Sequence, residues 1–166
     1  NLLKEIDMAI RGRNASGLLN QKTSAQYAGN GTAASAIFAS LRTSLLLKEA
    51  GVTIVTGGGA GTNVITVGTI RPQLYAQIPG AGAALVASID GTLGSDGEVA
   101  AGASVGTEYT TRDGSLKFVT AYQNASDRVF PKGTKFSVAQ QGNSAGNADD
   151  EFIAYMQLEE FGAPPA

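Results

Sequence analysis

The chain has 166 residues, a length typical of one domain, and its 12 basic and 14 acidic residues leave a net charge of −2. So balanced a charge argues against a protein that binds nucleic acid through many phosphate contacts, and no apolar run approaches the roughly 20 residues of a membrane-spanning helix. The chain contains no His and no Cys, which excludes Ser-His-Asp and Cys-His catalysis, Cys/His zinc sites and disulfides. We therefore expect no specific nucleic-acid partner, no membrane span, no cofactor and no enzymatic activity.

The N-terminal segment has the pattern of an arm. Its first ten residues repeat apolar side chains at the spacing of one helix face, and these are Leu2, Leu3, Ile6 and Ile10. Gly12 ends this predicted helix, and residues 13–32, rich in Asn, Ser, Gly and Gln, favour an extended conformation. A helix of this length is only marginally stable in water. Residues 1–32 are therefore predicted to be an arm that needs a surface to lie on.

Residues 33–50 show the most regular helical spacing in the chain. Thr32 is a suitable N-cap and Gly51 a suitable stop. The apolar residues on one face of this predicted helix are Ile37, Phe38, Leu41 and Leu45. We expect that face to pack in the core.

After Gly51 the apolar period changes to two, which is typical of strands. The predicted strands are 52–56, 63–70, 73–78, 84–89, 98–110 (one bent strand or two), 115–122, 134–140 and 151–161. Their spacing predicts a mainly β fold, an antiparallel jelly roll or β-sandwich of about eight strands. Residues 33–166 then form one β-domain with a leading helix over 33–50. The last strand is apolar on both faces, which indicates that the N-terminal helices or a neighbouring subunit cover it.

Two groups of carboxylates invite a chemical interpretation. Asp90, Asp96 and Glu98 bracket a Gly-rich turn and are weak calcium candidates, although the ligand order of an EF-hand is missing and a solvated turn explains them better. Glu98 and Glu108 are a candidate glycosidase pair, but no aromatic-rich pocket accompanies them. Neither group changes the expectation of a protein without a catalytic site or a bound metal.

Charge is distributed unevenly along the chain. Residues 1–51 carry six basic and three acidic side chains, a net +3, whereas residues 52–166 carry six basic and eleven acidic ones, a net −5. Opposite charges favour contact between the arm and an acidic surface. That surface belongs either to a neighbouring copy or to the last strand of the same chain. For contact between subunits, the candidate residues are Leu2, Leu3, Ile6, Ile10, Arg11 and Arg13.

The C-terminal part resembles known jelly rolls. Val129–Phe161 contains VFPKGTKFSV, a Gly/Asn loop and a long final strand, and this order is similar to the last two strands of viral and tumour-necrosis-factor-like jelly rolls. A helical arm before a compact β-barrel resembles small virion shell proteins, above all the capsid and head-decoration proteins of double-stranded DNA phages. The resemblance implies a structural protein of the virion, a homo-oligomer whose partners are its own copies and other shell proteins.

The alternative is an extracellular β-sandwich that binds a receptor or a carbohydrate. Such a module needs aromatic or carboxylate side chains in its loops, and the candidates are Tyr109, Tyr122 and Asp96. The chain has no Trp and only 7% aromatic residues, so a stacking platform for sugars is difficult to build. We therefore favour the shell protein.

Overall fold

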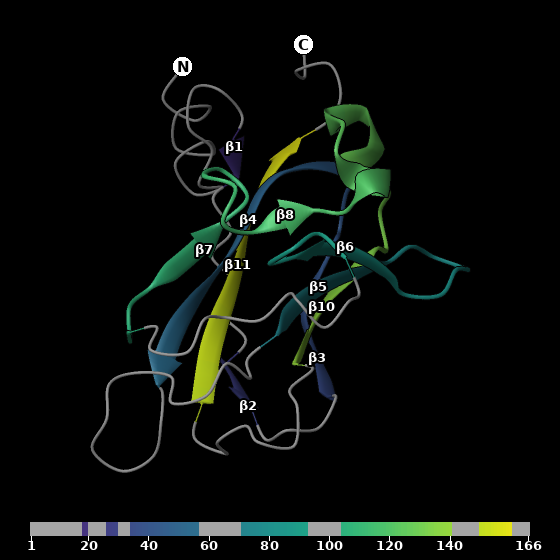
Figure 1. The fold of residues 1–166 in the computed structure, drawn as a ribbon. Coiled ribbons are helices and arrows are strands. Elements are labelled where there is room, and N and C mark those ends of the chain that lie inside the picture. The colour runs from purple at the N-terminus through teal and green to yellow at the C-terminus, as the bar shows by residue number, and fades with distance from the viewer. Residues whose placement is uncertain are drawn as a thin grey trace, which may run out of the picture.

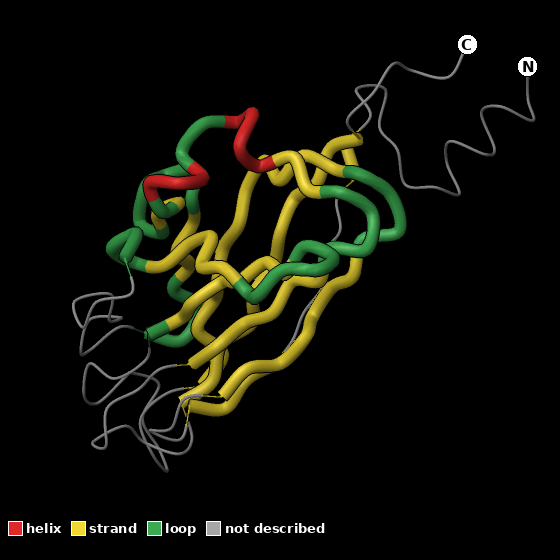
Figure 2. The backbone as a smooth tube through the Cα atoms, turned by 90° about the vertical axis from the view of Figure 1, so that its right-hand side faces the viewer, coloured by secondary structure: helices red, strands yellow, loops and turns green. Residues whose placement is uncertain are grey.

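The computed structural model describes residues 18–19, 26–29, 34–56, 71–92, 104–140 and 150–160. These residues form two antiparallel sheets that lie face to face (Figures 1 and 2). The prediction of a mainly β, antiparallel fold is thereby confirmed.

Sheet A has the order β1-β11-β4-β7, with β2 also paired to β11 and β9 also paired to β4. Its strands are β1 (Leu18–Leu19), β2 (Gln26–Gly29), β4 (Leu45–Thr56), β7 (Glu108–Thr110), β9 (Val129–Phe130) and β11 (Asp150–Glu160). Sheet B has the order β3-β10-β5-β6-β8. Its strands are β3 (Ala34–Ser40), β5 (Pro72–Gln77), β6 (Ala84–Ser88), β8 (Lys117–Phe118) and β10 (Lys135–Gln140).

The longest strand pair is β4 with β11. Ten residue pairs join them, from Glu151 opposite Thr56 to Glu160 opposite Leu45, with two register shifts on the way. Alternate residues of β11 are fully buried and face the core, whereas their neighbours are half-buried on the other face. This is the period of two that a strand imposes on its side chains.

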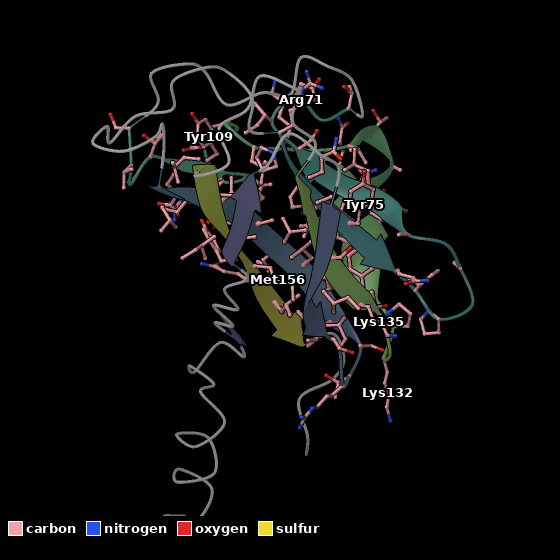
Figure 3. The ribbon with its side chains drawn as sticks, turned by 90° about the horizontal axis from the view of Figure 1, so that it is seen from below. Arg71, Tyr75, Tyr109, Lys132, Lys135 and Met156 are labelled. Atoms are coloured by element: carbon pink, nitrogen blue, oxygen red, sulfur yellow. The ribbon has the colours of Figure 1, made fainter. Side chains whose placement is uncertain are left out.

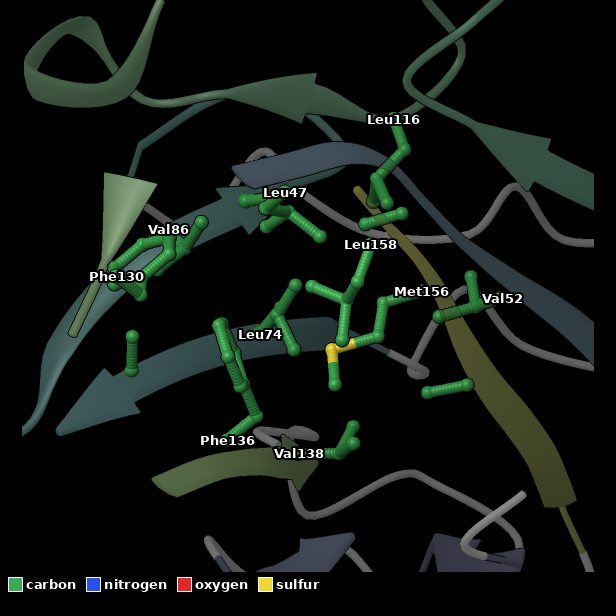
Figure 4. Packing of buried hydrophobic residues seen from close by; sticks show 14 of the residues in the cluster. Leu47, Val52, Leu74, Val86, Leu116, Phe130, Phe136, Val138, Met156 and Leu158 are labelled. Carbon is green, nitrogen blue, oxygen red and sulfur yellow. The ribbon is translucent and has the colours of Figure 1, made fainter. Parts of the chain in front are cut away.

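The core lies between the two sheets (Figure 4). Sheet A contributes Leu47, Ile54, Phe152, Met156 and Leu158, and sheet B contributes Leu74, Val86, Phe136 and Val138. The rings of Phe130 and Phe136 meet edge to face, with centroids 5.0 Å apart and planes at 78°. Because Phe130 is in sheet A and Phe136 in sheet B, this contact joins the two layers.

The chain passes from one sheet to the other at two adjacent corners. Residues 41–44 connect β3 to β4, and residues 131–134 connect β9 to β10. The Leu41 amide donates to the carbonyl of Thr134 at 2.8 Å, and the Gly133 amide donates to the carbonyl of Leu41 at 2.9 Å. Gly133 has φ +88°, a left-handed conformation suited to glycine. The paired corners therefore keep the two segments together: β3 pairs with β10 in sheet B, and β4 pairs with β9 in sheet A.

The predicted helix over residues 33–50 is wrong. Strand β3, the corner and the first half of β4 occupy this range. The error has a physical origin, because a spacing of four residues marks one face of a strand as well as one face of a helix. Leu41 and Leu45 are buried as expected, but Ile37 is 66% exposed, and the side chain of Phe38 lies outside the described residues.

The only helical turns among the described residues are two 3-10 turns, η1 (Thr120–Tyr122) and η2 (Ala125–Arg128), which lie together at one end of the sandwich (Figure 2). No helix in the described ranges is long and apolar enough to cross a membrane.

Part of the predicted arm belongs to sheet A. Leu18 and Leu19 pair with Glu159 and Leu158, and β2 pairs with the first four residues of β11. For these two strands, the alternative in which the arm folds back on the last strand of its own chain is realised. The predicted helix within residues 1–10 lies outside the described residues.

The strand predictions vary in accuracy along the chain. Strands β5, β6, β10 and β11 coincide with predictions to within about one residue at each end, and the prediction at 52–56 falls inside β4. The predictions at 98–110 and 115–122 shrink to β7 and β8, because turns and η1 occupy their remaining described residues. The strand predicted at 63–70 lies outside the described residues.

Phe136→Ala tests the core. Phe136 is fully buried, so its truncation should lower the free energy of unfolding by about 3–5 kcal/mol. Ile78→Ala is the matched control, because Ile78 is exposed and its side chain should contribute less than about 0.5 kcal/mol. Urea denaturation followed by circular dichroism measures both values, and equal losses would contradict the described packing.

Candidate functional site

Most of the predicted site residues lie outside the described part of the chain. This holds for all six candidate subunit contacts, Leu2, Leu3, Ile6, Ile10, Arg11 and Arg13, and for the calcium candidates Asp96 and Glu98. Within the described ranges, no group of three or more His, Cys, Asp or Glu residues is placed to hold a metal ion.

Asp90, the remaining calcium candidate, closes a turn after β6. Its Oδ1 accepts hydrogen bonds from the Ser88 hydroxyl at 3.0 Å and the Thr92 amide at 2.9 Å, and its Oδ2 accepts one from the Thr92 hydroxyl at 2.6 Å. Burial opposes ionisation, but the hydrogen bonds from Thr92 and Ser88 outweigh it and lower the pKa of Asp90. This carboxylate therefore serves the turn in which it lies.

Beside this turn is an open depression of about 360 Å³ between the end of β6, β8 and η1. Six of its ten lining residues have polar side chains, which carry hydroxyl, carboxylate, ammonium and amide groups. The lining consists of Asp90, Gly91, Thr92, Thr111, Gly114, Leu116, Lys117, Phe118, Thr120 and Gln123. Several hydrogen-bonding groups converging on one depression suit a small polar ligand.

Arg128 packs on Phe118, the aromatic residue that lines the depression. The guanidinium carbon of Arg128 lies 4.3 Å from the centroid of the Phe118 ring. Arg128 also donates from Nε to the carbonyl of Leu47 at 2.9 Å, and from Nη1 to those of Tyr122 and Gln123 at 2.9 and 2.6 Å. Burial lowers the pKa of Arg128, although the nearby negative charge of Asp127 acts in the opposite direction. Arg128 thus joins the segment of η1 and η2 to β4.

A second polar cluster lies on the face of sheet A that points away from the core. The Tyr155 hydroxyl on β11 donates to Oε1 of Glu49 on β4 at 3.0 Å. Glu49 is only 8% exposed, and Nη1 of Arg112 lies 3.9 Å from the same oxygen. Burial raises the pKa of Tyr155 well above its ordinary value, and the neighbouring carboxylates of Glu108 and Glu49 raise it further. Tyr155 therefore remains a protonated hydrogen-bond donor at neutral pH.

Gly51 makes room for this cluster. Tyr155 lies opposite Gly51 in the β4–β11 register, and a Cβ atom on Gly51 would come within 2.4–2.5 Å of the Tyr155 ring and hydroxyl. Sequence reasoning assigned Gly51 to a helix stop and so missed the site. The informative signal was the outward face of the final strand, where Tyr155 needs a partner for its hydroxyl.

The two tyrosines considered for ligand binding pack against the core. Tyr109 is half-buried on β7 and Tyr122 is half-buried in η1, with its ring centroid 5.7 Å from that of Phe130. Burial also raises the pKa of Tyr109. Neither ring offers the exposed face on which a sugar stacks.

Comparison with known proteins gives no relative: no family model, no curated protein and no solved structure matches the chain.

Tyr155→Phe tests the cluster on sheet A through its pH dependence. Unfolded tyrosine ionises near pH 10 whereas folded Tyr155 keeps its proton, so the unfolded state binds fewer protons above pH 10. The free energy of unfolding should be fully retained below pH 10 and fall above it. Tyr155→Phe should make this fall shallower, as measured by urea denaturation between pH 8 and 11.5.

Tyr75→Phe is the matched control for this experiment, because burial alone raises the pKa of Tyr75. It should change the pH dependence less than Tyr155→Phe does. If Tyr155→Phe leaves the fall unchanged, Tyr155 has no raised pKa and the proposed cluster is wrong.

Proposed function

We propose that the protein is a non-catalytic structural protein of a virion shell, either a small capsid protein or a capsid-decoration protein. Its β-sandwich has jelly-roll connectivity in this proposal, and its N-terminal segment joins it to copies of itself and to other shell proteins. The observation that supports the proposal is the sandwich of two antiparallel sheets, an architecture that jelly rolls share. β1 and β2 pair with β11 of the same chain, so this part of the N-terminal segment is attached to the body by backbone hydrogen bonds.

This attachment divides the former arm into two parts. Residues 18–19 and 26–29 pair with β11 of their own chain, and in the proposal residues 1–17 contact a neighbour. They contain the candidate contacts Leu2, Leu3, Ile6, Ile10, Arg11 and Arg13. In the proposal these residues form the amphipathic helix and dock on an adjacent subunit.

The apolar residues should dominate this contact. Four aliphatic side chains stabilise it by about 1.5–3 kcal/mol each when fully buried, whereas exposed ion pairs made by Arg11 and Arg13 contribute about 0–1 kcal/mol each. Salt screens the ion pairs, since the screening length falls from about 10 Å at 0.1 M to about 3 Å at 1 M. Burial of apolar surface is not screened, and salting-out ions strengthen it.

Ile6→Asp is the decisive variant for this mechanism. The purified protein should assemble with increasing concentration, and the assemblies should survive 1 M NaCl. Ile6→Asp should abolish them because it places a charge in the apolar stripe, whereas Arg11→Ala combined with Arg13→Ala should only weaken them. Light scattering after size exclusion, with electron microscopy of the largest fraction, measures the result. Dissociation by salt alone, with Ile6→Asp still assembling, would contradict the docking mechanism.

The second candidate is an extracellular binding module for a receptor or a carbohydrate, and the polar depression beside β8 favours it. In this case Lys117 and Gln123 would contact the ligand, since both line the depression and are exposed. A glycan array should then identify a glycan that the protein binds, and Lys117→Ala should weaken the affinity for that glycan at least tenfold. Lys132→Ala is the matched control, because Lys132 is exposed and does not line the depression. A monomer that binds a glycan through Lys117 would replace the shell protein as the favoured function.

A further inference from the structure

Three of the four sheet edges in the described part of the chain are guarded against pairing with another strand. Sheet A ends in β1 and β2 on one side and in β7 and β9 on the other, all between two and four residues long. Sheet B ends on one side in β8, which has two residues and includes Lys117. Short strands and charged side chains are common devices that keep sheet edges from joining.

The fourth edge, β3, is neither short nor charged, and the only irregularity in its pairing is one register shift. It is seven residues long, ASAIFAS, with no charged residue and no proline. Its ladder with β10 shifts once, opposite Phe136 and Ser137, and residues 34–37 pair regularly on one side of that shift. Among the described residues, β3 has β10 as its only strand neighbour. A long, uncharged edge of this kind is a template for a further strand.

A row of side chains on the outer face of sheet B ends at the β3 edge. Ile37, Ser137, Tyr75 and Leu85 lie opposite one another on β3, β10, β5 and β6, and so form one row across the sheet. Figure 3 shows Tyr75 on sheet B and Met156 on sheet A. Tyr75 and Leu85 are half-buried, whereas Ile37, at the end of the row, is 66% exposed. A strand added beside β3 would place a side chain opposite Ile37 and continue the row.

We propose that the occupant of this edge is β3 of a second copy of the chain, paired antiparallel about a two-fold axis at Ile37. In such a pair Ile37 faces its own symmetry mate, and every other residue of β3 faces the residue equally far on the other side of Ile37 in the second copy, so a charge at position 37 would face its like. β3 contains no charge, which satisfies this condition. The arrangement covers both exposed Ile37 side chains and turns the five strands of each sheet B into one continuous sheet.

This interface deepens the proposed function and rests on it, because it supplies a second contact between subunits besides residues 1–17. Residues 1–17 precede β1 of sheet A in the sequence, whereas β3 belongs to sheet B. A subunit with one contact of each kind has two independent partners, which an extended assembly requires.

Ile37→Lys tests the interface with Ile78→Lys as its matched control. Ile78 is an exposed isoleucine, at 41%, in the connection between β5 and β6, away from the β3 edge. Sedimentation velocity of the full chain measures the dissociation constant of the dimer. Ile37→Lys should raise this constant at least tenfold, whereas Ile78→Lys should leave it within twofold of the value for the unaltered protein. Equal dimerisation of the two variants would overturn the β3 interface.

A cysteine provides the second test, because the chain has no cysteine of its own. Ile37→Cys should form an intermolecular disulfide under mild oxidation, since directly opposed residues of antiparallel strands have Cβ atoms about 4.5–5.5 Å apart. Ile78→Cys should not. Failure of Ile37→Cys to cross-link in a dimer would show that the dimer uses another surface.

The same measurements separate the two proposals. If the unaltered protein assembles and Ile37→Lys assembles equally well, the β3 interface is wrong and the shell function stands. If deletion of residues 1–17 leaves a dimer that Ile37→Lys abolishes, the β3 interface is supported independently of the N-terminal contact. If the unaltered protein remains monomeric at every concentration, both proposals fail.

Discussion

The antiparallel pairing of β4 with β11 is the interaction on which the rest of the described structure depends. It is the longest ladder among the described residues, and its inward side chains supply half of the core that they form. The short strands of sheet A are all attached to one of these two strands, β1 and β2 to β11, and β7 and β9 to β4. A strand of two residues has too few hydrogen bonds to persist alone. These short strands therefore owe their order to the central pair.

Three charged side chains in the described ranges stabilise turns and connections. Arg128 donates to three backbone carbonyls, Asp90 closes the turn after β6, and Asp113 accepts a hydrogen bond from the Ser115 amide in the turn after β7. The hydrogen bonds from Ser115 accordingly lower the pKa of Asp113. These three side chains therefore hold in place the connections in which they lie.

The accuracy of the sequence analysis follows from the ambiguity of each pattern. Strands such as β10 were predictable because Phe136 and Val138 alternate with polar neighbours between clear turn signals. The region of β3 and β4 was not, since Ile37, Leu41 and Leu45 are spaced by four residues, which fits both a helix and a strand. Local pattern also gave no information on which sheet a strand joins, so the exposure of Ile37 came only with the fold.

The candidate sites were less predictable than the fold. The cluster around Glu49 requires a strand register that brings Tyr155 over Gly51, 104 positions away in the sequence. The polar depression likewise combines residues from the end of β6, from β8 and from η1. The amphipathic spacing of residues 2–10 is a local pattern, and the contact site predicted from it lies outside the described residues.

The order in which the strands follow along the chain determines how the protein would yield to tension. A pull from the N-terminal side reaches β1 first, then β2, and only then β3, so the load meets two, four and six paired residues in turn. Each short ladder opens before force is transmitted to the next, and the core between the sheets is loaded last. Under such a load β1 and β2 would separate from β11 while the two long sheets stay paired.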